Sequence, residues 1–376
     1  APRFLLSPKG RGAMPRFPMI FACLALWALP VQALESSQGA LRVEEKAQGL
    51  SAPWGFGFLP SGEVLITEKA GRLLRLDPDG RLSEITGLGE IANRGQGGLL
   101  DILVPGDFET RRELFFTFAK PQGQGEGTAV ARARLSPAGD ALQDWTVIYE
   151  MTPGSSGGRH FGSRLVEASD GTLFVTIGER GDRPSAQDLS RENGSVLRIT
   201  RTGEVPRDNP FVGQEGARGA IWSYGHRNPQ GAALDLDGQL WVSEHGAKGG
   251  DEVNRVVKGA NYGWPVISYG RHYSGAKIGE GTAKPGMEQP AHYWDPSIAP
   301  SGLMIYSGAL WPEWRGDVFT GSLKFGFLSR LDPSDGWAEE RIEGPETGRL
   351  RDLREAPDGA IWILSEEQGA LYRLSP

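Results

Sequence analysis

Short strand-like runs bounded by glycine recur along the chain, and they constrain the fold more than any other feature of the sequence. Four runs share one form, a glycine followed by apolar and β-branched residues: 62–67, 171–176, 238–243 and 359–364. A glycine-containing turn and an upstream strand precede each run. Several runs continue into a third strand, as at residues 72–76 and 370–374. The repeated unit is therefore a β-meander.

The number of repeats predicts the architecture. Two weaker copies, at residues 99–118 and 302–331, bring the count to six, at spacings of roughly 40 to 70 residues. The 54 glycines and 26 prolines mark turns throughout the chain, and no Pro/Ser-rich linker divides it. Because a meander of about four strands cannot bury both of its faces alone, we expect an all-β, six-bladed β-propeller with long inserted loops. A pair of β-sandwiches is the competing architecture.

The N-terminal segment has the pattern of a secretory signal peptide. Residues 14–33 combine a basic residue, an apolar run of about a dozen residues and a V-Q-A ending. We expect residues 1–33 to be a pre-sequence cleaved after Ala33, with Met14 as the initiator, and residues 34–376 to form a single domain. The apolar run is shorter than the roughly 20 residues of a membrane-spanning helix. The pattern predicts a periplasmic or secreted protein without a membrane span.

Cysteine usage and charge exclude several classes of function. The single cysteine, Cys23, lies inside the apolar run, so we expect no thiol or disulfide in the mature chain. The chain has 47 acidic and 40 basic residues, for a net charge of −7. This balance disfavours binding to nucleic acid or to an anionic membrane face.

Two polar loops between residues 221 and 265 are not required by a hydrophobic core. In the first, Arg227 and Asn228 directly precede Pro229, which biases Asn228 toward an extended backbone. The second loop, residues 244–251, contains three glycines and two acids. Its backbone can approach a ligand closely and turn carbonyl groups outward, as a hard cation requires. Ordinary turn chemistry explains any one of these residues, but the combination indicates a site.

Other polar residues lie just before or within apolar strands. Besides Arg227 and Asn228, they are Gln96, His160, Lys324, Arg349 and Arg351. In a propeller, the loops that enter the inner strands converge on one face. Four cations and two amides directed at one axis are costly unless an anion binds there. The alternative is a set of unrelated surface residues.

Eight segments in one order carry a resemblance to a known family. They are PWGFGFLPSGEVLITEKAGRL, GQGGLLDI, HFGSRL, AQDL, GEVPRDNPF, SYGHRNPQG, EHGAKGGDEVN and NYGWP. From about residue 50 to its C-terminus, the chain resembles the soluble sugar dehydrogenases that depend on pyrroloquinoline quinone (PQQ). These form the glucose/sorbosone dehydrogenase family, and the resemblance is to its aldose sugar dehydrogenase branch. It implies a six-bladed propeller that holds PQQ and Ca²⁺ on its loop face.

The resemblance also implies the catalytic residues. His160 matches the catalytic base, Arg227 and Asn228 match residues at the quinone carbonyls, and Gln96 matches a further donor to the cofactor. Oxidation of a C1 hydroxyl to a lactone removes the hydroxyl proton while hydride leaves C1 for the quinone. A neutral imidazole with a pKa of about 6.5 suits the first task. We expect Glu179 to accept the other ring N–H of His160, and Arg227 with Ca²⁺ to stabilise negative charge on the quinone oxygen.

The remaining assignments concern the cofactor carboxylates and the metal. Lys324, Arg349 and Arg351 match the cations that bind the carboxylates of PQQ. The backbone carbonyls of Gly246 and Ala247 match the calcium ligands, although the family often has proline at the second position. These assignments complete the predicted site.

The sequence constrains the substrate and the competing functions less closely than it constrains the cofactor site. Residues 292–301 take the place of an aromatic substrate wall, but their aromatic residues are displaced, so we expect a broad range of aldoses. The electron acceptor is not identified, and the lack of a second, dimer-supporting calcium motif predicts a monomer. A calcium-dependent lactonase on the same fold would have no use for Lys324, Arg349 and Arg351 together. A non-catalytic binding propeller would leave His160 and Glu179 without a role.

Overall fold

The structure is a computed structural model, and it describes residues 33–376. These residues form six antiparallel sheets, five with four strands and one with five. Each four-stranded sheet is one uninterrupted meander in the chain. The six-bladed propeller expected from the repeats is confirmed, and the pair of sandwiches is excluded.

The strands follow one another from the centre of the ring outward in each sheet. The first three sheets are β3 (Pro53–Phe58), β4 (Val64–Glu68), β5 (Arg72–Leu76), β6 (Leu82–Ile85); β7 (Leu99–Leu103), β8 (Glu113–Gln122), β9 (Gly125–Leu135), β10 (Leu142–Glu150); and β11 (Leu165–Glu167), β12 (Leu173–Ile177), β13 (Ser195–Ile199), β14 (Ile221–Ser223). The next two are β15 (Pro229–Leu234), β16 (Leu240–Glu244), β17 (Asp251–Arg255), β18 (His292–Trp294); and β19 (Pro300–Ile305), β20 (Val318–Ser322), β21 (Leu328–Asp332), β22 (Ala338–Ile342).

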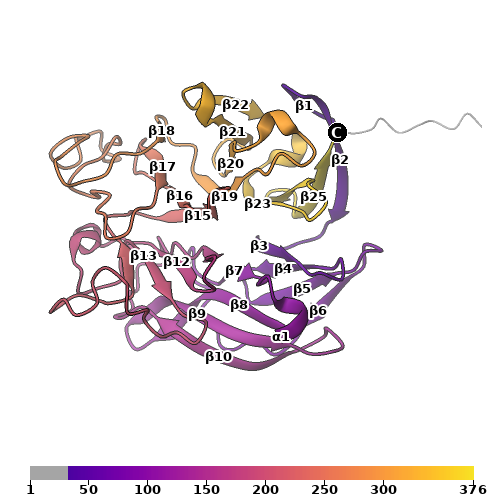
Figure 1. The fold of residues 1–376 in the computed structure, drawn as a ribbon, viewed down its shortest axis with the longest axis horizontal. Coiled ribbons are helices and arrows are strands. Elements are labelled where there is room, and N and C mark those ends of the chain that lie inside the picture. The colour runs from indigo at the N-terminus through magenta and orange to yellow at the C-terminus, as the bar shows by residue number, and fades with distance from the viewer. Residues whose placement is uncertain (1–32) are drawn as a thin grey trace, which may run out of the picture. The chain divides into compact units, whose positions relative to one another are not determined.

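The sixth sheet joins the two ends of the described chain. It contains β23 (Leu350–Glu355), β24 (Ile361–Ser365), β25 (Ala370–Ser375), β2 (Gly39–Ala47) and β1 (Ala33–Ser36). Val43 of β2 pairs with Leu374 of β25, so N-terminal strands close the ring. Short helical turns interrupt the loops: α1 (Phe108–Arg111), η1 (Arg183–Gln187), η2 (Pro312–Trp314), η3 (Pro333–Asp335) and η4 (Pro345–Thr347). Figure 1 shows β3, β7, β15, β19 and β23 nearest the centre.

The hydrophobic core is divided among the interfaces between neighbouring sheets. A cluster of buried residues fills each of the six interfaces. In one, Phe115 and Val130 of the second sheet pack with Leu173 and Val175 of the third. The second strands β4, β12 and β24 are buried on both faces, which explains why their sequences are mostly apolar instead of alternating.

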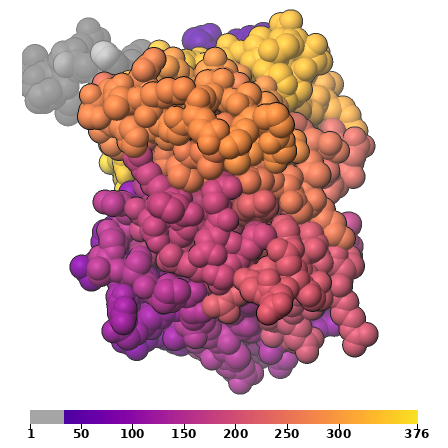
Figure 2. All heavy atoms as spheres, turned by 90° about the vertical axis from the view of Figure 1, so that its left-hand side faces the viewer, coloured from indigo at the N-terminus to yellow at the C-terminus, as the bar shows by residue number. Residues whose placement is uncertain are grey.

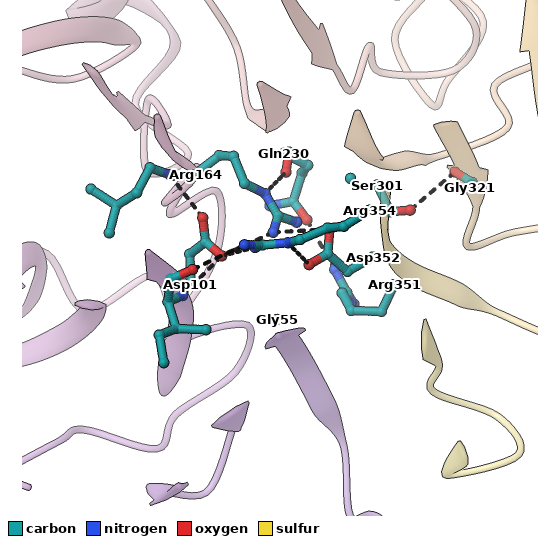
Figure 3. Close-up of polar contacts among 12 residues, drawn as sticks. Gly55, Asp101, Arg164, Gln230, Ser301, Gly321, Arg351, Asp352 and Arg354 are labelled. Carbon is teal, nitrogen blue, oxygen red and sulfur yellow. Dashed lines mark hydrogen bonds and ion pairs between the residues drawn. The ribbon is translucent and has the colours of Figure 1, made fainter. Parts of the chain in front are cut away.

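A buried network of ion pairs occupies the centre of the ring (Figure 3). Arg164 lies 3.1 Å from Asp101 and 3.2 Å from Asp352. Arg354 lies 2.6 Å from Asp101 and 3.0 Å from Asp352. The Nε of Arg164 also donates to the carbonyl of Gln230 at 2.9 Å. Two arginines and two aspartates thus link inner strands that lie far apart in the sequence.

Two long connections extend from the ring, as expected. They are residues 200–220, between β13 and β14, and residues 256–291, between β17 and β18. The second forms much of the orange surface in Figure 2. Within residues 33–376, no helix is long and apolar enough to cross a membrane. The predicted signal peptide lies outside the described residues, apart from Ala33 at the start of β1.

Candidate active site

The predicted site residues lie in two kinds of connection at one edge of the sheets. Gln96, His160, Arg227 and Arg349 precede the innermost strands β7, β11, β15 and β23. Lys324 does not share this position, contrary to our expectation of equivalent places, because it follows β20, the second strand of its sheet. In an antiparallel meander, the start of the first strand and the end of the second lie at the same edge. Both kinds of connection therefore reach the same face.

Three cavities on this face adjoin one another, since Gln96 lines all three. The first is lined by Gln96, Asn228, Arg349 and Arg351, the second by Gln96, His160, Glu179 and Arg227, and the third by Gln96, His160, Arg227, Gly246, Ala247 and Lys324. The third cavity has a volume of about 590 Å³. All the residues that we expected in the site therefore border one continuous depression.

His160 and Glu179 form a hydrogen-bonded pair at the centre of this depression. Nδ1 of His160 contacts Oε1 of Glu179, which also accepts the backbone N–H of Gly181 at 2.6 Å. The backbone N–H of His160 donates to Oε1 of Gln96 at 2.8 Å. His160 has a φ of 55°, in the left-handed region that non-glycine residues rarely adopt. Contacts to both its ring and its backbone hold the imidazole over the cavity.

The electrostatic surroundings favour a neutral imidazole and an ionised carboxylate. Burial, opposed by Glu179 and reinforced by the charges of Arg227 and Arg159, holds the pKa of His160 below its ordinary value. Burial would raise the pKa of Glu179, but hydrogen bonds from His160 and Gly181 bring it below its ordinary value. The ionised carboxylate therefore accepts a hydrogen bond from Nδ1–H, and the lone pair of Nε2 remains available as a base.

Arg227 is a buried cation with unused hydrogen-bonding capacity. Its exposed fraction is 6%, and no carboxylate of residues 33–376 lies within ion-pair distance of it. Its Nη1 donates to the carbonyl of His245 at 3.3 Å, but its Nε has no partner among the described residues. The guanidinium lies 5.3 Å from the ring of Trp264. A buried arginine with a free N–H can donate to an acceptor outside the protein, such as an electron-rich carbonyl oxygen.

Two of the cations expected to bind the cofactor carboxylates already pair with a carboxylate of the protein. Arg351 donates to Glu366 from Nε at 3.0 Å and from Nη2 at 2.9 Å, and to Gln230 from Nη1 at 2.9 Å. Its side chain is 11% exposed and lines the first cavity. Arg349 is exposed and lies 3.2 Å from Glu366. Lys69, which the sequence analysis missed, lines the same cavity.

The loop expected to bind calcium has closely packed backbone. A Cβ at Gly246 would lie 2.3 Å from the carbonyl oxygen of Gly249, so only glycine fits. The Gly246 N–H donates to Oδ1 of buried Asp251 at 2.7 Å. Residues 33–376 contain no group of three or more His, Cys, Asp or Glu side chains placed to hold a metal. Gly246 and Ala247, whose carbonyl groups we expected as calcium ligands, both line the third cavity.

Three further residues of the depression were not found from the sequence. Arg159 and Arg183 border the cavity that contains His160, and Tyr273 lines both that cavity and the one beside the calcium loop. Tyr273 lies in the long connection before β18, where no periodic pattern fixes its position. Of the expected substrate wall, Tyr293 stacks on Tyr269 with ring centres 4.0 Å apart and lines none of the three cavities.

Comparisons with known proteins assign the chain to a class. The family described as Glucose / Sorbosone dehydrogenase matches residues 50–373. The chain therefore belongs to the glucose/sorbosone dehydrogenase family, and the resemblance seen in its motifs is confirmed.

Individual relatives define the branch of this family. The chain is 39% identical over 368 residues to the aldose sugar dehydrogenase YliI of Escherichia coli (strain K12), covering 96% of this chain and 97% of that protein. A crystal structure of a glucose dehydrogenase shares 42% identity and a TM-score of 0.86, over 89% of this chain and 99% of that one. The PQQ-bound aldose sugar dehydrogenase of Streptomyces coelicolor shares 26% identity and a TM-score of 0.75, over 89% and 98% of the two chains.

Proposed function

We propose that this protein is a PQQ-dependent aldose sugar dehydrogenase that oxidises the C1 hydroxyl of an aldose to a lactone. The observation that carries the proposal is the arrangement around His160. A neutral imidazole oriented by a buried carboxylate lies in one depression with Arg227, a buried cation that has no carboxylate partner among residues 33–376. The names of the relatives, and the PQQ bound in one of them, support the same function.

The roles of the catalytic side chains follow from their contacts. Nε2 of His160 would take the proton of the C1 hydroxyl, and Glu179 would stabilise the resulting imidazolium through Nδ1. Arg227 would donate to an oxygen that gains negative charge. When bound, PQQ would supply the acceptor for the hydride that leaves C1, and Ca²⁺ would polarise it. Proton and hydride thus leave the sugar together, and its C1 becomes a lactone carbonyl.

The proposed cofactor site uses the rest of the depression. Lys324, Arg349 and Arg351 would bind the carboxylates of PQQ, and Gln96 and Asn228 would donate to its polar edge. The carbonyls of Gly246 and Ala247 would hold Ca²⁺. The lactonase alternative requires acidic side chains around an axial metal, but in residues 33–376 the axial aspartates are paired with arginines.

The biological setting completes the proposal. The protein would be exported to the periplasm or beyond it, would act as a monomer, and would pass electrons to an acceptor that its own residues do not identify. Its substrate would be an aldose sugar. A non-catalytic binding propeller would not require the oriented His160–Glu179 pair.

Reconstitution tests the proposed function. Purified apoprotein is incubated with PQQ and Ca²⁺, and the reduction of an artificial dye is followed with a panel of aldoses. We expect dye reduction that depends on PQQ, on the sugar and on Ca²⁺, with loss of activity after chelation and recovery when Ca²⁺ is restored. If no aldose supports PQQ-dependent reduction in a correctly folded preparation, the assignment as an aldose dehydrogenase is wrong.

A further inference from the structure

The cavity that contains His160 is lined by more positive charge than the proposed reaction requires. Arg159, Arg183 and Arg227 all border it, while Glu179 is its only acidic lining residue among residues 33–376. Glu179 is already bound to His160 and Gly181. The excess charge is concentrated here although the chain as a whole carries a net charge of −7.

None of these arginines has a carboxylate partner in the described part of the chain. Elsewhere, partly buried arginines such as Arg198 and Arg201 each lie within 3 Å of an aspartate. Arg183 instead donates to Nδ1 of His272 at 2.7 Å and lies 5.2 Å from the ring of Trp264. These neutral contacts orient its guanidinium without neutralising its charge.

Arg159 is exposed, and its side chain borders the cavity beside Gly181. A Cβ at Gly181 would lie 2.5 Å from Nε of Arg159, so this glycine leaves room for the arginine to lie across the loop that follows Glu179. Gly181 also has a φ of 84°, which disfavours other residues. The positive charge of Arg159 also lowers the pKa of the His160 imidazole.

The proposed cofactor does not account for Arg159 and Arg183. Its carboxylates would bind Lys324, Arg349 and Arg351, which line the other two cavities and not this one. Arg227 would contact a quinone oxygen. The cavity that remains beside His160 has a volume of about 340 Å³, within the range of about 300–1,000 Å³ typical of small-molecule sites.

We propose that the substrate is an acidic aldose, a sugar that carries a carboxylate or a phosphate, and that Arg159 and Arg183 bind its anionic group while its C1 hydroxyl lies at His160. This inference rests on the proposed dehydrogenase function and narrows its substrate class. Arginine presents a planar fork of donors that suits both carboxylate and phosphate oxygens. Because the two arginines lack acidic partners, an anion would gain their charge without displacing an existing ion pair.

Kinetics with charged and neutral sugars test the inference. The holoenzyme is assayed with D-glucuronate, glucose 6-phosphate and glucose, and kcat/KM for each acidic sugar is divided by that for glucose. We expect a ratio of roughly ten or more for at least one acidic sugar, and the one preferred distinguishes carboxylate from phosphate. The ratio should fall as ionic strength rises from about 0.01 M to about 0.15 M, because the screening length falls from about 30 Å to about 8 Å.

Matched variants locate the effect. Arg159→Gln and Arg183→Gln should each lower the ratio about tenfold, mainly through KM for the acidic sugar. Arg207→Gln makes the same change of charge at an exposed residue that lines none of the three cavities, and should keep the ratio. If glucose is oxidised but no acidic sugar is preferred, or if Arg207→Gln has the same effect, the inference fails while the proposed function stands.

A binding measurement separates this inference from the proposed function. D-glucuronate and glucose 6-phosphate are titrated by calorimetry into protein loaded with reduced PQQ and Ca²⁺, so that no turnover occurs. We expect binding that the Arg159→Gln/Arg183→Gln double variant weakens at least tenfold. If neither sugar binds, or if acetate or inorganic phosphate alone binds as tightly, the acidic-sugar site is disproved. If the acidic sugars bind but neither they nor glucose are oxidised, the dehydrogenase function is the part that fails.

Discussion

At the scale of single residues, the proposed chemistry depends on which ring nitrogen of His160 carries the proton. The hydrogen bond from Nδ1 to Glu179 assigns the proton to Nδ1 and leaves Nε2 as the base. His160→Ala should therefore bind PQQ and Ca²⁺ nearly normally but lose roughly 10²- to 10⁴-fold in kcat. Stopped-flow measurement of dye reduction at saturating cofactor and sugar tests this. His292→Ala, which changes a histidine outside the three cavities, is the control and should keep its turnover.

The pH profile makes a second prediction at this scale. Burial holds the pKa of His160 below its ordinary value, so kcat/KM for glucose should fall on the acid side below about pH 6.5. Glu179 raises that pKa and Arg159 lowers it. Glu179→Gln should therefore shift the acid limb to lower pH, and Arg159→Gln should shift it to higher pH. If the acid limbs of the two variants shifted in the same direction, the titrating group would not be His160.

At the scale of elements, the start of β23 connects the cofactor site to the rest of its sheet. Arg351 is held by Glu366 and Gln230, and β23 carries it to the edge of the depression. Because the guanidinium is already oriented, it can bind a carboxylate with little further loss of side-chain entropy. The same contacts explain why the side chain of Arg351 is mostly buried.

Replacement of Arg351 tests this role. Arg351→Ala should raise the dissociation constant of PQQ roughly 30- to 150-fold, since a charge-assisted pair contributes about 2 to 3 kcal/mol. Fluorescence titration of the apoprotein with PQQ measures the change. Circular dichroism should show a retained fold, since Glu366 keeps Arg349 as a partner. A variant that titrates like the wild type would mean that Arg351 does not bind the cofactor.

At the scale of the whole molecule, the axial network links β7, β23 and the start of β11, which belong to three different sheets. Asp101→Asn removes a buried charge that pairs with both Arg164 and Arg354, and should lower the free energy of unfolding by about 3 kcal/mol. Lys284→Gln, which breaks an exposed pair with Glu280, should change it by less than about 0.5 kcal/mol. Urea denaturation compares the two variants. Equal midpoints would contradict a stabilising role for the network.

The export prediction also concerns the whole chain. The apolar run and V-Q-A ending predict cleavage after Ala33, so the mature protein should begin at Leu34. Leu34 is buried and belongs to the core between the last two sheets, so cleavage there would leave β2 intact. N-terminal sequencing of the exported protein measures the start. An N-terminus at Ala1 or Met14 would reject the signal peptide.

The sequence by itself determined the six repeats and most of the residues around the depression. In four of the sheets the second strand is mostly apolar and follows a glycine turn, so local sequence alone defines its position. Gln96, His160 and Arg227 were found because they interrupt this pattern beside a strand. A polar residue in such a place is recognisable without a structure.

Only the tertiary structure decided which partners these residues have. The pairing of Arg351 with Gln230, and of Asp101 with Arg354, joins residues from different sheets that lie more than 100 residues apart in the chain. Tyr273 and Arg159 reach the depression from irregular loops, and Arg183 reaches it from the short helical turn η1. Hydrophobic periodicity encodes the face of a strand, but it carries no information on distances between loops, which depend on how six sheets close into a ring.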